Sequence, residues 1–267
     1  SGKLVWKFKS LKKINARGMT FWYNKNNPKN SCLFVPIRDS VFCINYKTGK
    51  KLQSFGKNGF IKTGIVRAAP VIWNNNLIVA TLDTLKIKSF SLKNGDFLWD
   101  IPIHPENKNF KGGTPWGGIS LDSKRGLLFV STGNPRPALY GGKRKGDNKN
   151  TNSLVVFDLM NKNIKWTFQE VAHDLWDYDI ASPPLLSSIK LNGEIIDVVI
   201  IMTKIGNTFV FTREEGVPLY GINYKDAPAS DIINEVTANK QIDVDLPKST
   251  IKFQFESNQR NWASTGT

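Results

Sequence analysis

The sequence predicts an all-β protein, a β-propeller of four-stranded blades. A phrase made of a turn and then a large aromatic residue recurs at intervals of about 45 to 65 residues, the length of one blade. Strand-length runs lie between these phrases, and no stretch shows sustained helical periodicity with caps. Because one blade cannot bury both of its faces, stacked neighbours and the recurring aromatic residues would supply the core.

The repeated phrases and the runs between them define the predicted elements. The phrases are SGKLVW (1–6), KTGKKLQSF (47–55), KNGDFLW (93–99), NKNIKW (161–166) and EGVPLY (215–220). The predicted strands are short alternating or β-branched runs at 33–37, 41–46, 77–82, 87–92, 127–131, 154–159, 198–202 and 208–211. Residues 74–76, 122–126 and 192–193 have the composition of hairpin turns.

Length and repeat count predict one domain over residues 1–267, with four to five blades. Residues 226–267 form a tail that the repeat pattern does not assign. No apolar run approaches the roughly 20 residues that span a bilayer, so we expect no transmembrane segment in this chain. The first residues also lack a targeting pattern, so we expect that any export signal is missing from the chain.

Charge and cysteine content narrow the partners and the redox chemistry. The formal net charge of +15 comes from Lys and Arg scattered through turns, which favours a solvated surface over a nucleic-acid site. Such a surface could attract an acidic electron-accepting protein. Cys32 and Cys43 flank a predicted hairpin turn, but symmetric pairing about that turn would not place them opposite each other. A disulfide is therefore open but not expected.

Residues 166–179, WTFQEVAHDLWDYD, concentrate acids, large aromatic residues and one of the two histidines. Carboxylates beside indole rings lose hydration, which raises their pKa toward the range that a general base needs. Asp177 is the first candidate for that base. The alternative is a loop whose acids cap turns and whose aromatic residues fill the core.

Together with TGNPRP (132–137) and RKGDN (144–148), this segment resembles the quinoprotein dehydrogenases. These are propeller enzymes that oxidise alcohols or aldose sugars with pyrroloquinoline quinone, and FGKNG (55–59) resembles their glucose-dehydrogenase-like branch. The resemblance implies repeats of the tryptophan-docking type and a ring of eight blades. With four to five blades, this chain would be either a piece of a longer polypeptide or a smaller ring.

The turn GGTPWGG (112–118) would hold the quinone. Its glycines allow close approach of the backbone to a flat ligand, and an exposed indole face offers a stacking surface. The resemblance makes Trp116, which stands 18 residues before Asn134, the floor beneath the quinone, and it brings Thr114 to the edge of the cofactor.

Oxygen-bearing side chains would hold a Ca²⁺ ion, which acts on the quinone as a Lewis acid. The resemblance assigns Asn134 to the metal, and it makes Asp177 both the general base and a metal ligand. Asp179 would face the same side as Asp177 in an extended segment, so it could be a further metal ligand, as in relatives that take lanthanide ions. Asp83 could stand in for another acidic ligand or belong to a hairpin turn.

Two basic residues complete the pocket that the resemblance implies. Lys204 would bind the oxygens of the quinone, and Arg17 would bind its carboxylates. We interpret His173 as structural and His104 as a turn residue, and two histidines without metal spacing make a zinc site improbable.

The predicted function is therefore a dehydrogenase that uses pyrroloquinoline quinone and Ca²⁺ to oxidise an aldose or an alcohol. No haem-attaching Cys-x-x-Cys-His motif is present, so electrons would leave to a separate acceptor, a quinone or a cytochrome. The resemblance places the domain in the periplasm. The alternatives are a non-catalytic propeller that binds proteins and a truncated, inactive member of the family.

Overall fold

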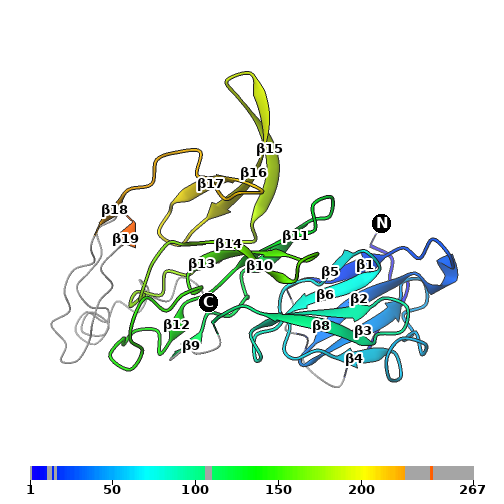
Figure 1. Ribbon diagram of the computed structural model, residues 1–267. Helices are drawn as coiled ribbons and strands as arrows, with labels where there is room; N and C mark the ends of the chain where they lie inside the picture. Colours follow the sequence, from blue (N-terminus) through cyan, green and yellow to red (C-terminus); the bar gives the residue numbers. More distant parts are fainter. Residues whose placement is uncertain (1, 11–13, 15–16, 106–109, 226–240, 243–267) are drawn as a thin grey trace. The chain divides into compact units, whose positions relative to one another are not determined.

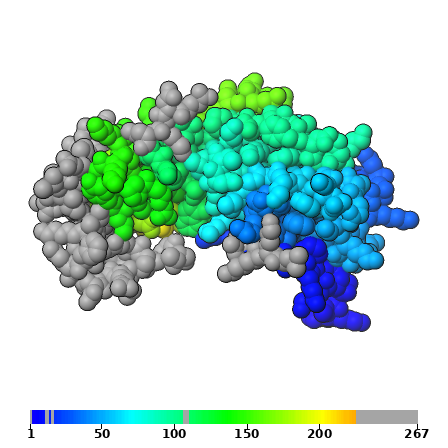
Figure 2. Space-filling view, turned by 90° about the horizontal axis from the view of Figure 1, so that it is seen from below, coloured from blue at the N-terminus to red at the C-terminus, as the bar shows by residue number. Residues whose placement is uncertain are grey.

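The computed structural model describes residues 2–10, 14, 17–105, 110–225 and 241–242. Figure 1 draws these residues as a coloured ribbon, and Figure 2 shows them as spheres. Their regular elements are β-strands and one short 3₁₀ helix, η1 (Pro28–Asn30), so the all-β prediction is confirmed. No helix in these residues has the length and apolar character that a membrane crossing requires. The chain divides into two compact units, Ser1–Pro102 and Ile103–Thr267. The single domain over 1–267 stays a prediction.

The first unit contains two four-stranded antiparallel sheets, each with its strands in chain order. The first sheet contains β1 (Thr20–Trp22), β2 (Cys32–Ile37), β3 (Ser40–Asn45) and β4 (Phe60–Lys62). The second contains β5 (Val71–Trp73), β6 (Asn76–Ala80), β7 (Lys86–Ser91) and β8 (Phe97–Pro102). Buried side chains of both sheets, including Phe34, Phe55, Leu77 and Phe90, form one apolar cluster. Each sheet therefore covers a face that its neighbour would otherwise leave in water.

The second unit contains two further sheets and two short strand pairs. The first sheet pairs β10 (Gly118–Asp122), β11 (Leu127–Ser131), β13 (Ser153–Asp158) and β14 (Asn163–Gln169), and the second pairs β15 (Leu185–Leu191), β16 (Glu194–Met202) and β17 (Thr208–Thr212). The short pairs join β9 (Lys111–Gly112) to β12 (Pro135–Arg136) and β18 (Tyr224–Lys225) to β19 (Gln241–Ile242). Phe129, Phe168 and Phe211 belong to the core cluster that joins the two larger sheets. Most of the predicted tail, 226–267, lies outside the described residues.

Glycines in the repeated turns lie directly against the aromatic residues of other phrases. A Cβ on Gly49 would lie 2.6 Å from the Trp6 ring, and one on Gly216 would lie 2.5 Å from the Trp166 ring. Both glycines have positive φ, 68° and 71°. Only glycine combines this backbone conformation with such a close approach. The same contact in both units explains why the turn-and-aromatic phrase recurs.

The two cysteines are free and buried in the first sheet. Register places Cys32 opposite Asn45, and it places Cys43 opposite Phe34. The sequence expectation that the cysteines do not face each other directly is confirmed. Their sulfur atoms are nevertheless 2.8 Å apart, because diagonal neighbours share one face of the sheet.

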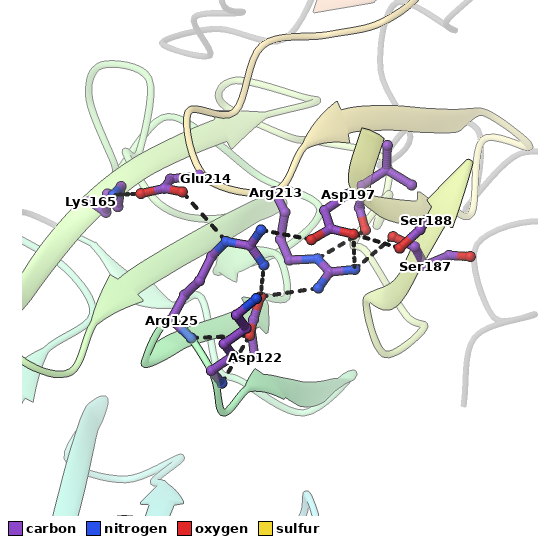
Figure 3. Close-up of polar contacts among 10 residues, drawn as sticks. Asp122, Arg125, Lys165, Ser187, Ser188, Asp197, Arg213 and Glu214 are labelled. Atoms are coloured by element: carbon purple, nitrogen blue, oxygen red, sulfur yellow. Dashed lines mark hydrogen bonds and ion pairs between the residues drawn. The ribbon is translucent and has the colours of Figure 1, made fainter. Parts of the chain in front are cut away.

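An ion-pair network joins the two larger sheets of the second unit (Figure 3). Asp122, at the end of β10, accepts hydrogen bonds from Arg125 Nη1 at 2.8 Å and Arg213 Nη1 at 3.0 Å. Arg125 also donates from Nη2 to Asp197 Oδ2, at 2.7 Å. Burial alone would raise the pKa of Asp122, but the bonds from Arg213 and Arg125 outweigh it, so the pKa lies below its usual range.

Replacing Asp122 with Asn should destabilise the second unit. The side chain is 5% exposed, so the change leaves two arginines without their shared carboxylate and should cost about 2–4 kcal/mol in urea unfolding at pH 7. A carboxylate with a lowered folded pKa contributes stability above its unfolded pKa and loses it as pH falls through the folded pKa. The difference between variant and wild type should therefore shrink below about pH 4.

The control is Asp39→Asn, which breaks the exposed pair of Asp39 with Lys62. The Asp39 and Lys62 side chains are 41% and 62% exposed, so this change should cost no more than about 1 kcal/mol. Equal losses in the two variants would contradict the role assigned to Asp122.

Candidate active site

Two loops of the second unit are fastened together beside the ribbon of β9 and β12. The first, 112–118, carries Trp116, and the second follows β11 and carries Asn134. The Thr114 carbonyl accepts the backbone N–H of Gly133 and that of Trp116, both at 2.9 Å. Because one carbonyl accepts hydrogen bonds from both loops, it holds the backbone that carries the Trp116 indole close to the backbone that carries Asn134.

A polar cluster forms where these loops meet the segment after β14 and the turn after β16. Trp116 Nε1 donates to Asp179 Oδ2 at 2.7 Å. Lys204 Nζ forms ion pairs with Asp179 Oδ1 and with Asp177 Oδ2, the latter at 3.1 Å. The Asn134 amide contacts Asp177 Oδ1, and Lys204 Nζ lies 5.7 Å from the centroid of the Trp116 ring. The structure thus brings together five of the predicted site residues.

Burial and charge give the acids of the cluster different properties. The Asp179 side chain is 4% exposed, whereas that of Asp177 is 24% exposed and can still reach solvent. Burial and then the Asp179 charge raise the pKa of Asp177, and Lys204 opposes this shift. Burial lowers the pKa of Lys204, but its hydrogen bond to Asp179 and the charges of both acids outweigh this effect, so the pKa is raised. Lys204 therefore remains an ammonium ion at neutral pH.

The backbone of Asp177 is held in an unusual conformation by Asp174. Asp177 has φ 65°, in the left-handed region. The Asp174 carboxylate accepts the backbone N–H of Trp176 at 2.9 Å and that of Tyr178 at 3.0 Å. It also accepts the Asn152 amide at 3.0 Å. A buried carboxylate therefore binds the peptide groups on both sides of the candidate base and fixes its direction.

The buried Arg144 side chain supports the same loop. Its Nε donates to the Pro137 carbonyl at 2.9 Å, and Nη2 donates to the Asp174 carbonyl. Burial raises the pKa of Asp174 to about 6, with its hydrogen-bond donors and the Arg144 charge opposing that shift. His173 Nδ1 lies 2.7 Å from the Gly146 carbonyl, a contact that fits the predicted structural role.

The other residues that the sequence singled out have contacts of their own. Thr114 acts through its carbonyl, as described above. Arg17 belongs to the first unit, where its backbone N–H donates to the Arg67 carbonyl at 2.8 Å, and its role at the cofactor stays a prediction. Asp83 also belongs to the first unit and accepts the Ile65 N–H at 3.0 Å, as a turn residue does. His104 is buried, with Nε2 2.9 Å from the Gly113 carbonyl, so it supports the Trp116 loop.

The sequence interpretation gave no role in the site to Asp174, Glu170 or Arg136. The Arg136 charge is one of the contributions that lower the pKa of Asp177. Asp174 and Glu170 stand in the segment already noted for its density of acids. That density was the available signal, but the strand and loop positions that bury these two side chains are not visible in residue spacing.

Cation binding can be judged from the donor set. Asn134, Asp177 and Asp179 present hard oxygen atoms, which fit Ca²⁺ or a similar ion. Within the described ranges, no three residues drawn from His, Cys, Asp and Glu gather to form a metal site. Three protein ligands are also fewer than the roughly six to eight that Ca²⁺ takes, so the cofactor and water would complete the shell. Asn134, Asp177 and Asp179 would therefore fit such a cation only together with further oxygen ligands.

The fold and the cluster agree with the comparisons to known proteins. Residues 1–264 match the family "PQQ: Glucose/ethanol/alcohol dehydrogenase, beta-propeller domain", where PQQ is pyrroloquinoline quinone, and the chain belongs to this family. The family assignment and the propeller fold predicted from the sequence are thereby confirmed.

Three individual relatives share only 20–26% of their aligned residues with this chain. Quinoprotein glucose dehydrogenase A of Acinetobacter calcoaceticus is 26% identical, and the match covers 85% of this chain and 35% of that protein. The glycerol dehydrogenase large subunit of Gluconobacter oxydans is 25% identical, with coverage of 87% and 37%. The quinohemoprotein alcohol dehydrogenase of Comamonas testosteroni has a similar fold, with a TM-score of 0.67, 20% identity and coverage of 90% and 41%. This chain thus spans between a third and two fifths of the length of two relatives that it matches.

Replacing Gly133 with Ala should disturb the cluster. The added Cβ would lie 2.6 Å from Trp116 Nε1 and 3.1 Å from Asp179 Oδ2, so the indole must move away from the carboxylate. We expect a loss of about 1–3 kcal/mol in urea unfolding, and a shift of the Trp116 indole N–H signal in the NMR spectrum. The control is Gly221→Ala, because among the described residues, apart from its chain neighbours, none has an atom within 4 Å of the new Cβ. An unshifted indole signal in Gly133→Ala would contradict the described packing.

Proposed function

We propose that this chain forms part of a dehydrogenase that oxidises an aldose sugar or an alcohol with pyrroloquinoline quinone. The observation that supports the proposal is the convergence of Trp116, Asn134, Asp177 and Lys204 from four separate loops. A scaffold propeller has no need to gather an indole, an ammonium and paired acids at one place. The names of two relatives, a glucose dehydrogenase and a glycerol dehydrogenase, favour a polyhydroxylated substrate.

The side chains of the cluster offer separate functions. The Trp116 indole provides a flat face, and Lys204, which lies near that face, can donate hydrogen bonds to oxygens of a bound ring. Asn134 and Asp179, with Asp177, would hold a Ca²⁺ or lanthanide ion. When bound, the quinone and the ion would supply the electron acceptor and its Lewis-acid activation.

Asp177 has the properties of a general base. It is partly exposed, its pKa is raised, and its direction is fixed by the peptide groups bound to Asp174. We assign it the removal of the hydroxyl proton of the substrate at a carboxylate oxygen. Lys204 and Asn134 hold that carboxylate in place.

Other parts of the proposal depend on the family. Arg17 would bind a carboxylate of the quinone, and Thr114 would contact its edge. Electrons would pass to a separate quinone or cytochrome, and the domain would work in the periplasm. None of these assignments is needed for the local chemistry of the cluster.

Asp177→Asn should remove activity and keep cofactor binding. The amide has nearly the same shape but cannot accept the proton, so dye reduction with glucose or an alcohol should fall by about 10²- to 10⁴-fold. Calorimetric titration of the intact apo protein with quinone and Ca²⁺ should still show binding. The matched control is Asp158→Asn, because Asp158 is the last residue of β13, accepts the Met160 N–H at 2.9 Å and should leave turnover unchanged. Retained turnover in Asp177→Asn would reject the base.

Trp116→Ala should chiefly weaken retention of the quinone. The stacking of a nucleic-acid base on an aromatic side chain is worth about 1–3 kcal/mol, and a similar loss here should lower the affinity for the quinone about 5- to 150-fold. Quinone absorbance after dialysis measures this effect. Trp99→Ala is the control, because Trp99 is a partly buried strand residue of the first unit. An unchanged quinone spectrum in Trp116→Ala would reject the stacking assignment.

A further inference from the structure

The turn that carries Lys204 is short and closed by its own backbone. It joins β16 to β17, and the Thr203 N–H donates to the Asn207 carbonyl at 3.1 Å. The Gly206 N–H donates back to the Thr203 carbonyl at 3.1 Å. Lys204 leaves this turn and reaches Asp177 and Asp179. The position of the ammonium group therefore depends on where the turn is held.

Glu170, which follows β14 in the neighbouring sheet, binds both ends of this turn. Its Oε1 accepts the Thr203 hydroxyl at 2.8 Å and the Asn207 amide at 3.1 Å. Its own backbone N–H donates to the Asn152 carbonyl at 3.0 Å. A single oxygen atom thus ties the two residues that flank the Lys204 turn to the sheet that precedes the Asp177 segment.

This contact carries an energetic cost. Glu170 is 1% exposed, and its Oε2 has no hydrogen-bond partner among the described residues. Burial raises the pKa of Glu170 to about 7, the Thr203 and Asn207 bonds oppose this shift, and the Asp174 charge adds to it. An apolar residue of similar size would avoid this cost but could not accept the two hydrogen bonds. The carboxyl group is therefore better explained by its hold on the turn than by stability.

We infer that Glu170 is a positioning residue, which holds the β16–β17 turn so that the Lys204 ammonium stays between Asp177 and Asp179. This inference rests on the proposed function only in so far as Lys204 binds the quinone. The geometry of Lys204 itself can be tested without cofactor.

The test compares Glu170→Met, which keeps the volume and removes the acceptor, with Glu170→Gln, which keeps an acceptor oxygen. Limited acetylation of the intact protein without cofactor, read by mass spectrometry, reports how firmly the ammonium is held. Lys86, which pairs with Asp100 in the first unit, is the internal reference. Glu170→Met should raise the Lys204 rate relative to Lys86 by about five-fold or more, and Glu170→Gln should stay within about two-fold of wild type.

A second pair of variants covers the case in which Glu170→Met does not fold. Thr203→Val removes one donor to Glu170, whereas Thr203→Ser retains it. The valine variant should raise Lys204 acetylation and the serine variant should not. Unchanged Lys204 acetylation in a folded Glu170→Met or Thr203→Val variant would overturn the inference.

Quinone titration separates this inference from the proposed function. Where Lys204 is both positioned by Glu170 and in contact with the quinone, Glu170→Met should weaken quinone affinity and Glu170→Gln should restore it. A wild-type protein that binds no quinone but shows the acetylation pattern would refute the proposed function and support the positioning role. If the wild-type protein binds quinone and oxidises substrate, but the variants leave Lys204 acetylation unchanged, the positioning role is refuted and the proposed function is supported.

Discussion

The contact on which the candidate site depends is that of the Lys204 ammonium with two neighbouring carboxylates. Asp177 and Asp179 are two residues apart and partly or fully withdrawn from water, so without a cation their charges would repel each other. Lys204 relieves this repulsion from a separate turn, and the Trp116 indole donates to one of the same carboxylates. The turn, the acidic segment and the Trp116 loop are therefore linked through a few charged atoms.

These loops can be held only because rigid sheets surround them. The strands that precede them, β11, β14 and β16, contribute side chains to one apolar core cluster. Between the strands, the chain is fixed by buried polar groups: Asp174 binds peptide N–H groups, and Arg144 binds carbonyl groups. Buried carboxyl and guanidinium groups are costly unless they are satisfied, and here each one holds a loop between strands through several hydrogen bonds.

Sequence reasoning recovered the strands better than it recovered what supports the site. The predicted strand 127–131 coincides with β11, because it is a continuous apolar run with turn residues at both ends. The phrases KNGDFLW and NKNIKW predict a turn before an aromatic residue, and in the structure they lead into strands β8 and β14. The partly exposed faces of these two strands weaken the apolar pattern that would mark them as strands. The resemblance to the quinoprotein dehydrogenases identified Trp116 and Lys204 as candidate site residues. Glu170 went unassigned because its partners, Thr203 and Asn207, come from another sheet, and no spacing in the chain encodes that contact.

The charge balance of the cluster connects its structure to the proposed cofactors. With both acids ionised and Lys204 protonated, Asp177, Asp179 and Lys204 sum to one negative charge. A divalent cation among the same oxygens would change that sum to one positive charge, which suits a ligand that carries carboxylates. The same cation would favour the ionised form of Asp177 and so oppose the rise in pKa that burial and Asp179 produce. Under the proposed function, the cation would therefore have to bind before the anionic ring or together with it, because without the cation the cluster and the ring both carry negative charge and repel each other.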